Sequence, residues 1–132
     1  MAGERDLAKL LQGMRPVLNP GKYVYCTFPA RVPAGMRPVV TVTEAEGITA
    51  VLPQEEADSL GLRYDYVAAW ITLRIHSALA AVGLTAAVAG RLAEAGISCN
   101  VVAGFHHDHL FVGADDAVRA LRTLEELAAG QP

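Results

Sequence analysis

Three histidines and an aspartate stand together in the last third of the chain, as His106, His107, Asp108 and His109. Neutral imidazoles and a carboxylate are good ligands for zinc or nickel. In a tight hairpin, however, His107 and His109 share one face while His106 and Asp108 turn away, which leaves too few convergent ligands for a structural metal site. We therefore expect no metal and no cofactor, an Asx-type turn at Asp108, and histidines that line a surface or an interface. A pH-sensitive contact is the alternative role for them.

A second group of candidate residues surrounds a glycine that precedes a predicted helix. Gly83 stands directly before the helix predicted over 84–95, where unpaired backbone N–H groups favour a carboxylate, although a tight strand-to-helix turn also explains this glycine. Ser98 and Asn100 alternate along a predicted strand, so their face either holds an α-amino group or is a solvated or subunit-contacting surface. His76 ends an earlier strand at the mouth of the same loop, where it either donates to a ligand oxygen or caps a loop carbonyl.

The remaining reactive side chains form no catalytic set. Cys99 alternates with Ile97 and Val101 on a predicted apolar face, where a thiol behaves as a small hydrophobic side chain, and Cys26 is similarly placed. The sequence contains no Ser-His-Asp spacing, paired-carboxylate site or phosphate-binding loop. We therefore expect a protein without catalytic activity, with an enzyme that uses the histidine cluster as the alternative.

Hydrophobic periodicity predicts the elements that position these residues. The first part of the chain predicts a helix over 4–14, a strand over 23–28, a loop over 29–38, a hairpin over 39–52 and a short helix over 53–58. The second part predicts a strand over 67–76, a helix over 84–95, and strands over 97–104 and 110–112. A last helix is expected to be capped by Asp115 and to bury Ala117, Leu121, Leu124 and Ala128.

The order of elements from residue 67 onward is β-α-β-β-α. This is a ferredoxin-like βαββαβ unit without its last strand. A sheet that lacks an edge strand must be completed or covered, and the first part of the chain can supply the strand. The sequence therefore predicts an α+β, ferredoxin-like fold, βαββα(β), whose sheet is completed by the N-terminal half.

Several motifs together resemble the signature of ACT domains, which are small ligand-binding modules of amino-acid metabolism. The motifs are GERDLAKLL at 3–11, WITLRIHS at 70–77, VGLTAAV at 82–88 and GISCNVVAGFHHDHLFV at 96–112. As a set they resemble stand-alone bacterial ACT-domain proteins. The resemblance implies an ACT-type fold, with an N-terminal ACT-like half over 1–65 and an ACT domain over 66–132.

The same resemblance implies a regulatory domain that binds a small molecule, an amino acid or a close relative. The candidate ligand-binding residues are His76, Gly83, Leu84, Thr85, Ser98 and Asn100. Many ACT loops carry a proline before the glycine, whereas this chain has Val82, which leaves the loop shape and the ligand open. A dimerisation domain that binds no ligand is the alternative.

Composition narrows the class of partner. The chain has 132 residues, of which 52% are hydrophobic and 19% charged, so it folds rather than remaining disordered. Eleven basic against 14 acidic residues give a net charge of -3 with no Lys/Arg cluster, which argues against nucleic acid. Without a signal-peptide pattern or an apolar run of membrane-spanning length, we expect a soluble protein, and two distant cysteines without CxxC spacing favour the cytoplasm. We expect its sheets to align edge to edge, either within the chain or across a two-fold axis in a homodimer.

Overall fold

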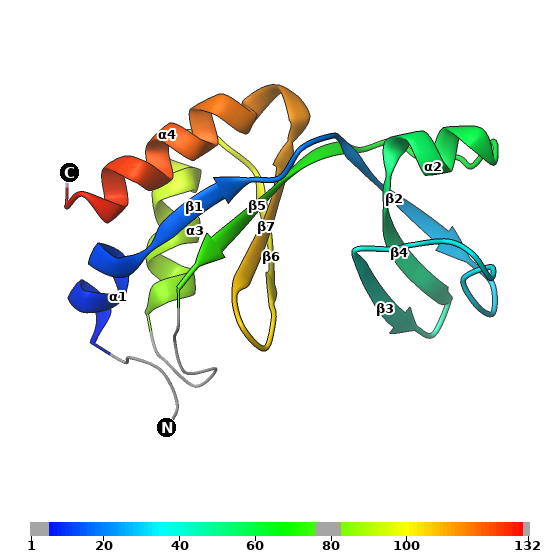
Figure 1. Cartoon of the computed structure of the whole chain (residues 1–132), viewed down its shortest axis with the longest axis horizontal. Helices are drawn as coiled ribbons and strands as arrows, with labels where there is room; N and C mark the ends of the chain where they lie inside the picture. Colours follow the sequence, from blue (N-terminus) through cyan, green and yellow to red (C-terminus); the bar gives the residue numbers. More distant parts are fainter. Residues whose placement is uncertain (1–5, 76–82, 131–132) are drawn as a thin grey trace. The chain divides into compact units, whose positions relative to one another are not determined.

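The computed structural model describes residues 6–75 and 83–130, and the chain divides into two compact units. Unit 1 combines residues 1–19 with residues 69–132, and unit 2 comprises residues 20–68. Figure 1 identifies the helices and strands of each unit. Over the described ranges, no helix has both the length and the apolar composition needed to cross a bilayer.

Unit 1 contains a sheet with the strand order β1-β5-β7-β6. Its strands are β1 (Arg15–Leu18), β5 (Val67–Arg74, which belongs to unit 1 from Ala69), β6 (Cys99–Ala103) and β7 (Asp108–Gly113). Its helices are α1 (Leu7–Gly13), α3 (Leu84–Glu94) and α4 (Ala117–Ala128), with a 3₁₀ turn at Ala114–Asp116 before α4.

This strand order confirms the ferredoxin-like prediction for unit 1. The succession β5-α3-β6-β7-α4 lacks a final strand, and β1 takes its place by pairing antiparallel with β5, from Arg15 opposite Arg74 to Leu18 opposite Ile71. The N-terminal part of the chain therefore completes the sheet, as predicted. The strand itself was not among the predicted elements; it contains Pro16, which cannot donate to a ladder and is tolerated at a sheet edge.

One face of this sheet carries the core of unit 1. Alternation along β5 buries Ala69, Ile71 and Leu73, which are at most 4% exposed. Buried side chains from all three helices pack with them, namely Leu10 and Met14 from α1 and its C-cap, Leu84, Val88 and Leu92 from α3, and Ala120, Leu124 and Leu127 from α4. The helices therefore cover the same face of the sheet.

The prediction for the last helix was wrong in its start and partly wrong in its buried face. A 3₁₀ turn comes first, and Asp116 rather than Asp115 occupies the N-cap of α4. The Asp116 carboxylate makes no capping bond and instead accepts a hydrogen bond from Arg119 at 3.0 Å. The buried residues of α4 are Ala120, Thr123, Leu124 and Leu127, so only Leu124 of the expected set is fully buried.

Unit 2 is a sheet of three strands to which the first residues of β5 add a short pairing. Its elements are β2 (Tyr23–Phe28), β3 (Val40–Glu44), β4 (Gly47–Pro53) and α2 (Gln54–Ser59), and Tyr23 and Val24 pair with Ala68 and Val67. The predicted hairpin is confirmed, and its turn requires glycine. A Cβ on Gly47, at φ +149°, would lie 2.6 Å from the carbonyl oxygen of Phe28.

Candidate ligand-binding site

The start of α3 is built around Gly83. This residue is the N-cap of α3 with a left-handed φ of +100°, and no side chain caps the helix. A side chain at this φ is strained, so glycine is required by the turn itself. Among residues 6–75 and 83–130, no side-chain capping bond occupies the first-turn N–H groups of this 11-residue helix, and such groups can stabilise an anion.

The two residues after Gly83 differ in accessibility. Leu84 is 3% exposed and its side chain belongs to the core of unit 1, so only its backbone can contact a ligand. Thr85 is exposed. His76, the fourth candidate at this loop, lies outside the described residues.

Ser98 and Asn100 are both exposed and lie at the opposite end of α3. The backbone N–H of Ile97 binds the carbonyl of Leu92 at 2.9 Å, which holds the start of β6 against the last turn of α3. At 1.5 Å per residue, the 11 residues of α3 separate its two ends by about 15 Å. The structure therefore does not bring Gly83 and Ser98 together within one chain.

Asn100 also lies on the sheet face away from the helices. It pairs with Phe111 on β7, and Val102 pairs with His109. Phe111 stacks on Trp70 with ring centroids 6.3 Å apart. We call this side of the unit 1 sheet the Trp70 face; it includes Arg15, Val17, Trp70, Thr72, Arg74, Asn100, Val102, His109 and Phe111.

A hydrogen-bonded cluster that the sequence analysis did not predict occupies the Trp70 face. The indole Nε1–H of Trp70 donates to Nδ1 of His109 at 3.1 Å, and Thr72 Oγ1 lies 3.2 Å from the same nitrogen. The side-chain amide of Asn19 donates to Thr72 Oγ1 at 2.9 Å and to the Trp70 carbonyl at 3.2 Å. Trp70 and Thr72 are two residues apart on β5 and therefore share a face, but the sequence does not specify which residue of β7 lies beside them.

Burial sets the ionisation of this part of the sheet. It lowers the pKa of His109, and the neighbouring His107 lowers it further, while Asp108 acts in the opposite direction. Burial raises the pKa of Asp108, against the opposing effect of His109 and His107. His109 is therefore favoured in its neutral form.

The tip of the β6–β7 hairpin lies at the end of the sheet where β5 finishes and α3 begins (Figure 1). His107 Nδ1 is 3.4 Å from the carbonyl oxygen of Ile75, and the turn is closed by a 2.9 Å bond from Gly104 N–H to the carbonyl of His107. Asp108 is the first residue of β7, so the prediction of an Asx turn at this residue was wrong. The turn is made by residues 104–107 instead, with Phe105 83% exposed at its tip.

The histidine cluster does not converge on a common point. Nδ1 of His109 faces Trp70, whereas Nδ1 of His107 faces the end of β5. Over residues 6–75 and 83–130, no group of three or more His, Cys, Asp or Glu side chains is placed to hold a metal ion.

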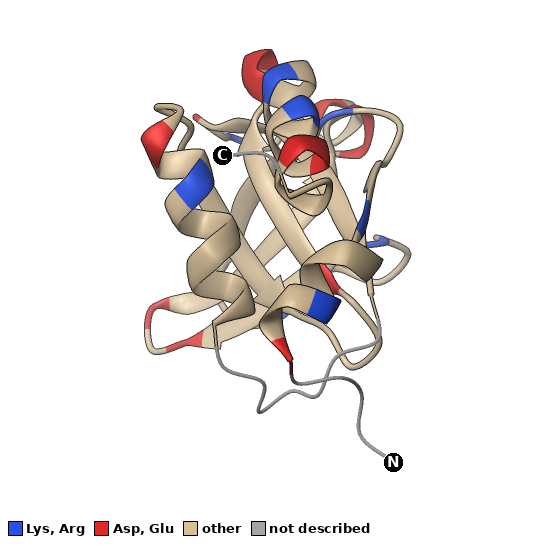
Figure 2. Cartoon of the chain, turned by 90° about the vertical axis from the view of Figure 1, so that its left-hand side faces the viewer, with Lys and Arg blue, Asp and Glu red and all other residues tan. Residues whose placement is uncertain are grey.

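The charged residues on the helices of unit 1 are of both signs (Figure 2). Arg91 and Glu94 on α3 form an ion pair at 3.8 Å, and Arg119 near the start of α4 pairs with Asp116 at 3.0 Å. Such exposed pairs contribute little to stability. The helical side of unit 1 therefore carries mixed charge rather than a basic surface.

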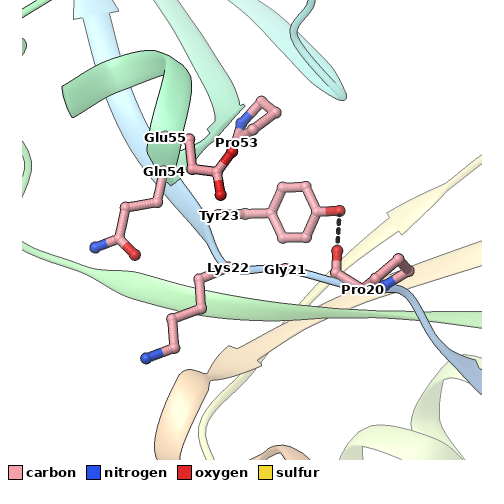
Figure 3. A pocket seen from close by; sticks show the side chains of 7 residues that line it. All are labelled: Pro20, Gly21, Lys22, Tyr23, Pro53, Gln54 and Glu55. Atoms are coloured by element: carbon pink, nitrogen blue, oxygen red, sulfur yellow. Dashed lines mark hydrogen bonds between the residues drawn. The ribbon is translucent and has the colours of Figure 1, made fainter. Parts of the chain in front are cut away.

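Unit 2 has a surface depression of about 540 Å³ lined by Pro20, Gly21, Lys22, Tyr23, Pro53, Gln54 and Glu55. The hydroxyl of Tyr23 donates to the Pro20 carbonyl at 2.7 Å, so it is already engaged. Figure 3 shows the Lys22 side chain extending away from the Glu55 carboxylate. The two charged groups that line this depression, those of Lys22 and Glu55, therefore do not converge on one ligand.

Comparison with known proteins identifies relatives over most of the chain. Two family models, each described as an ACT domain, match residues 2–69 and 66–126. A protein of unknown function from Vibrio cholerae has 47% sequence identity over 92% of this chain and 95% of that chain, with a TM-score of 0.85. No curated protein matches the chain.

More distant structures share the fold. A protein from Agrobacterium tumefaciens is 20% identical over 87% of this chain and 89% of that chain, with a TM-score of 0.67. The regulatory subunit of aspartate kinase from Thermus thermophilus, in its ligand-free form, is 9% identical over 87% of this chain and 98% of that chain, with a TM-score of 0.61. The two family models meet at residues 66–69, close to the point at which β5 passes from unit 2 to unit 1.

Proposed function

Because the chain belongs to the ACT-domain family, we propose that it is a regulatory module that binds a free amino acid and has no catalytic activity of its own. The observation that carries this proposal is the succession of two ACT-domain matches from residue 2 to residue 126. We take residues 1–65 and 66–132 as the two ACT-like halves.

The start of α3 supports the binding of a carboxylate. Gly83 leads into the helix, no described side chain makes a capping hydrogen bond to the first turn, and Thr85 is exposed there, while the Leu7 side chain lies beside Gly83. Backbone N–H groups and the positive end of the helix dipole stabilise an anion at such a place. His76 and the backbone of Leu84 complete the proposed carboxylate contacts.

Ser98 and Asn100 are the proposed partners of the α-amino group. Because α3 separates Ser98 from Gly83 by about 15 Å within one chain, and Asn100 lies on the sheet face away from the helices, we propose that a second copy of the chain supplies one of the two groups to a single amino acid. The sheet allows this, since β6 is the last strand in the order of unit 1 and no described strand pairs with its outer edge. We therefore propose a homodimer in which the ligand lies between copies.

A melting screen tests the proposed function. Each of the twenty amino acids is added at about ten millimolar, which exceeds a micromolar dissociation constant more than 100-fold and adds about 2.7 kcal/mol or more to stability. We expect a small subset to raise the melting temperature, and Asn100→Ala to abolish the rise without unfolding the protein. If no amino acid changes the melting temperature or the oligomeric state, a dimerisation domain without a ligand replaces this proposal.

A further inference from the structure

The hydrogen bonds around His109 require that its Nδ1 nitrogen carries no hydrogen. The indole N–H of Trp70 can only donate, and it lies 3.1 Å from Nδ1. Thr72 Oγ1 lies 3.2 Å from the same nitrogen and accepts a 2.9 Å hydrogen bond from the Asn19 side chain. A hydroxyl has one hydrogen and two lone pairs, so Thr72 can also donate to Nδ1. In the neutral imidazole, Nδ1 therefore accepts and Nε2 carries the hydrogen.

Protonation of His109 reverses the role of Nδ1. Both nitrogens of an imidazolium ring donate, so an N–H group at Nδ1 faces the N–H group of Trp70, and an indole nitrogen offers no acceptor in its place. Thr72 can respond to the change, because its hydroxyl can rotate and offer its second lone pair to Nδ1 while it still accepts from Asn19. A proton on His109 therefore breaks the contact with Trp70 and preserves the contact with Thr72.

The titratable neighbours of His109 on the β6–β7 hairpin act in opposite directions. His107 lowers the pKa of His109, as burial does, whereas Asp108 raises it. His106 is exposed in the turn and contacts the rings of Phe105 and His107. Together, burial and these neighbours lower the pKa of His109, so the proton binds on the acid side of the ordinary range of histidine.

The charged side chains that the other strands place on the Trp70 face are cationic. Arg74 is exposed and shares the face, because it follows Thr72 by two residues on β5. Arg15 of β1 pairs opposite Arg74, and its guanidinium donates at 3.2 Å to two backbone carbonyls at the end of α1. The residues of β6 on this face are uncharged, namely Asn100 and Val102. Within the described strands of unit 1, no carboxylate lies on this face to compensate a proton, since Asp108 alternates with His109.

We propose that His109 is an acid-sensitive switch, in which a proton on Nδ1 releases Trp70 from β7 and leaves His109 bound to Thr72. The switch acts between two neighbouring strands of the unit 1 sheet, because Trp70 belongs to β5 and His109 to β7. It goes beyond the proposed function, since it requires no ligand. In the neutral state the indole is held against His109, and in the protonated state the indole has lost this acceptor.

The single tryptophan of the chain reports the switch directly. The test follows the indole N–H resonance of Trp70 and the ring-nitrogen resonances of His109 by NMR, from about pH 8 to about pH 4. We expect both to change with one midpoint below the ordinary value for histidine, while the backbone amide spectrum remains that of the folded protein. An indole resonance that does not respond while His109 titrates would overturn the proposal. So would a neutral His109 with its hydrogen on Nδ1, or global unfolding in place of the local change.

The substitution His109→Asn removes the titration and keeps an acceptor for Trp70. An asparagine amide oxygen can accept from the indole but binds no proton in this range, so we expect the Trp70 resonance to stay constant with pH. His106→Asn is the matched control, because His106 is exposed in the adjacent turn. We expect it to retain the pH response of the wild type. A wild-type response in His109→Asn would assign the change to another group and refute the switch.

Trp70→Phe tests the same coupling from the other side of the contact. Phenylalanine keeps an aromatic ring on the face but has no N–H group, so the neutral form of His109 loses a hydrogen bond. The loss of one such bond changes an equilibrium constant by a factor of about 2 to 10. We therefore expect His109 to bind its proton about 2- to 10-fold more tightly in this variant. An unchanged or weaker proton affinity would show that Trp70 does not stabilise the neutral form.

Discussion

Replacing Gly104 by alanine tests whether the β6–β7 turn packs as closely on His109 as the structure indicates. The added Cβ would lie 2.6 Å from the carbonyl oxygen of His107 and 3.1 Å from Nε2 of His109. The same His107 oxygen accepts the 2.9 Å hydrogen bond that closes the turn. Relieving the contact therefore lengthens this bond and displaces the imidazole from Trp70.

The expected loss of folding stability follows from these contacts. Forcing an extra carbon into a packed site costs about 1 to 3 kcal/mol, which includes weakening of the turn hydrogen bond. For a chain of this length, each kcal/mol lowers the melting temperature by about 3 °C, so we expect a decrease of about 3 to 9 °C. Gly104 does not have a positive φ, so backbone strain contributes nothing to this difference.

Thermal unfolding followed by fluorescence measures the effect, because Trp70 is the only tryptophan and lies against His109. Gly90→Ala on α3 is the control, since a Cβ there would meet no atom within 4 Å. Alanine in a helix is favoured over glycine by about 0.5 to 1 kcal/mol, so this variant is expected to be more stable than the wild type. A Gly104→Ala protein that melts at or above the wild-type temperature would refute the packing argument.

Two further predictions concern ionisation, and a third concerns the turn before α3. Burial raises the pKa of Cys99 to about 11, so at about pH 8 iodoacetamide is expected to modify it about 100-fold more slowly than an unhindered cysteine; equal rates in a peptide-mapping experiment would contradict this. Because the pKa of His109 is lowered in the folded state, the unfolded state binds more protons below about pH 6.5, and the free energy of unfolding is expected to fall as the pH decreases from there. The same decline in a denaturation series of His109→Asn would assign the pH dependence to other groups. Gly83→Val is expected to lose about 1 to 2 kcal/mol through its left-handed backbone, and a melting temperature equal to that of the wild type would show that this conformation is not needed.

The fold was largely predictable because each element has a local pattern. Strict alternation identified β5, and the periodic apolar residues between Gly83 and Gly96 identified α3. The strand β1 was not predicted. It has only four residues, and one of them is Pro16, which argues against a strand unless the pairing strand is known. That partner, β5, is more than 50 residues away in the sequence.

The candidate site was less predictable, because it depends on contacts between strands. The alternation of Ser98 and Asn100 indicated an exposed face, which the structure confirms for both residues. The contact of His109 with Trp70 depends on which residues of β5 and β7 lie side by side, and single-strand patterns do not specify this. The separation of Gly83 from Ser98 follows from the length of α3, because the two residues flank opposite ends of this helix. The helix length was predictable from the sequence, but the path of β6 back along the helix was not.

Calorimetric titration of the amino acid selected by melting tests amino-acid binding most directly. With on the order of ten heavy atoms, such a ligand is expected to bind with a micromolar dissociation constant. We expect saturable binding of about one molecule per chain, or one per site between two copies, and its loss in Gly83→Val. Heats that show no saturation for any of the twenty amino acids would contradict it.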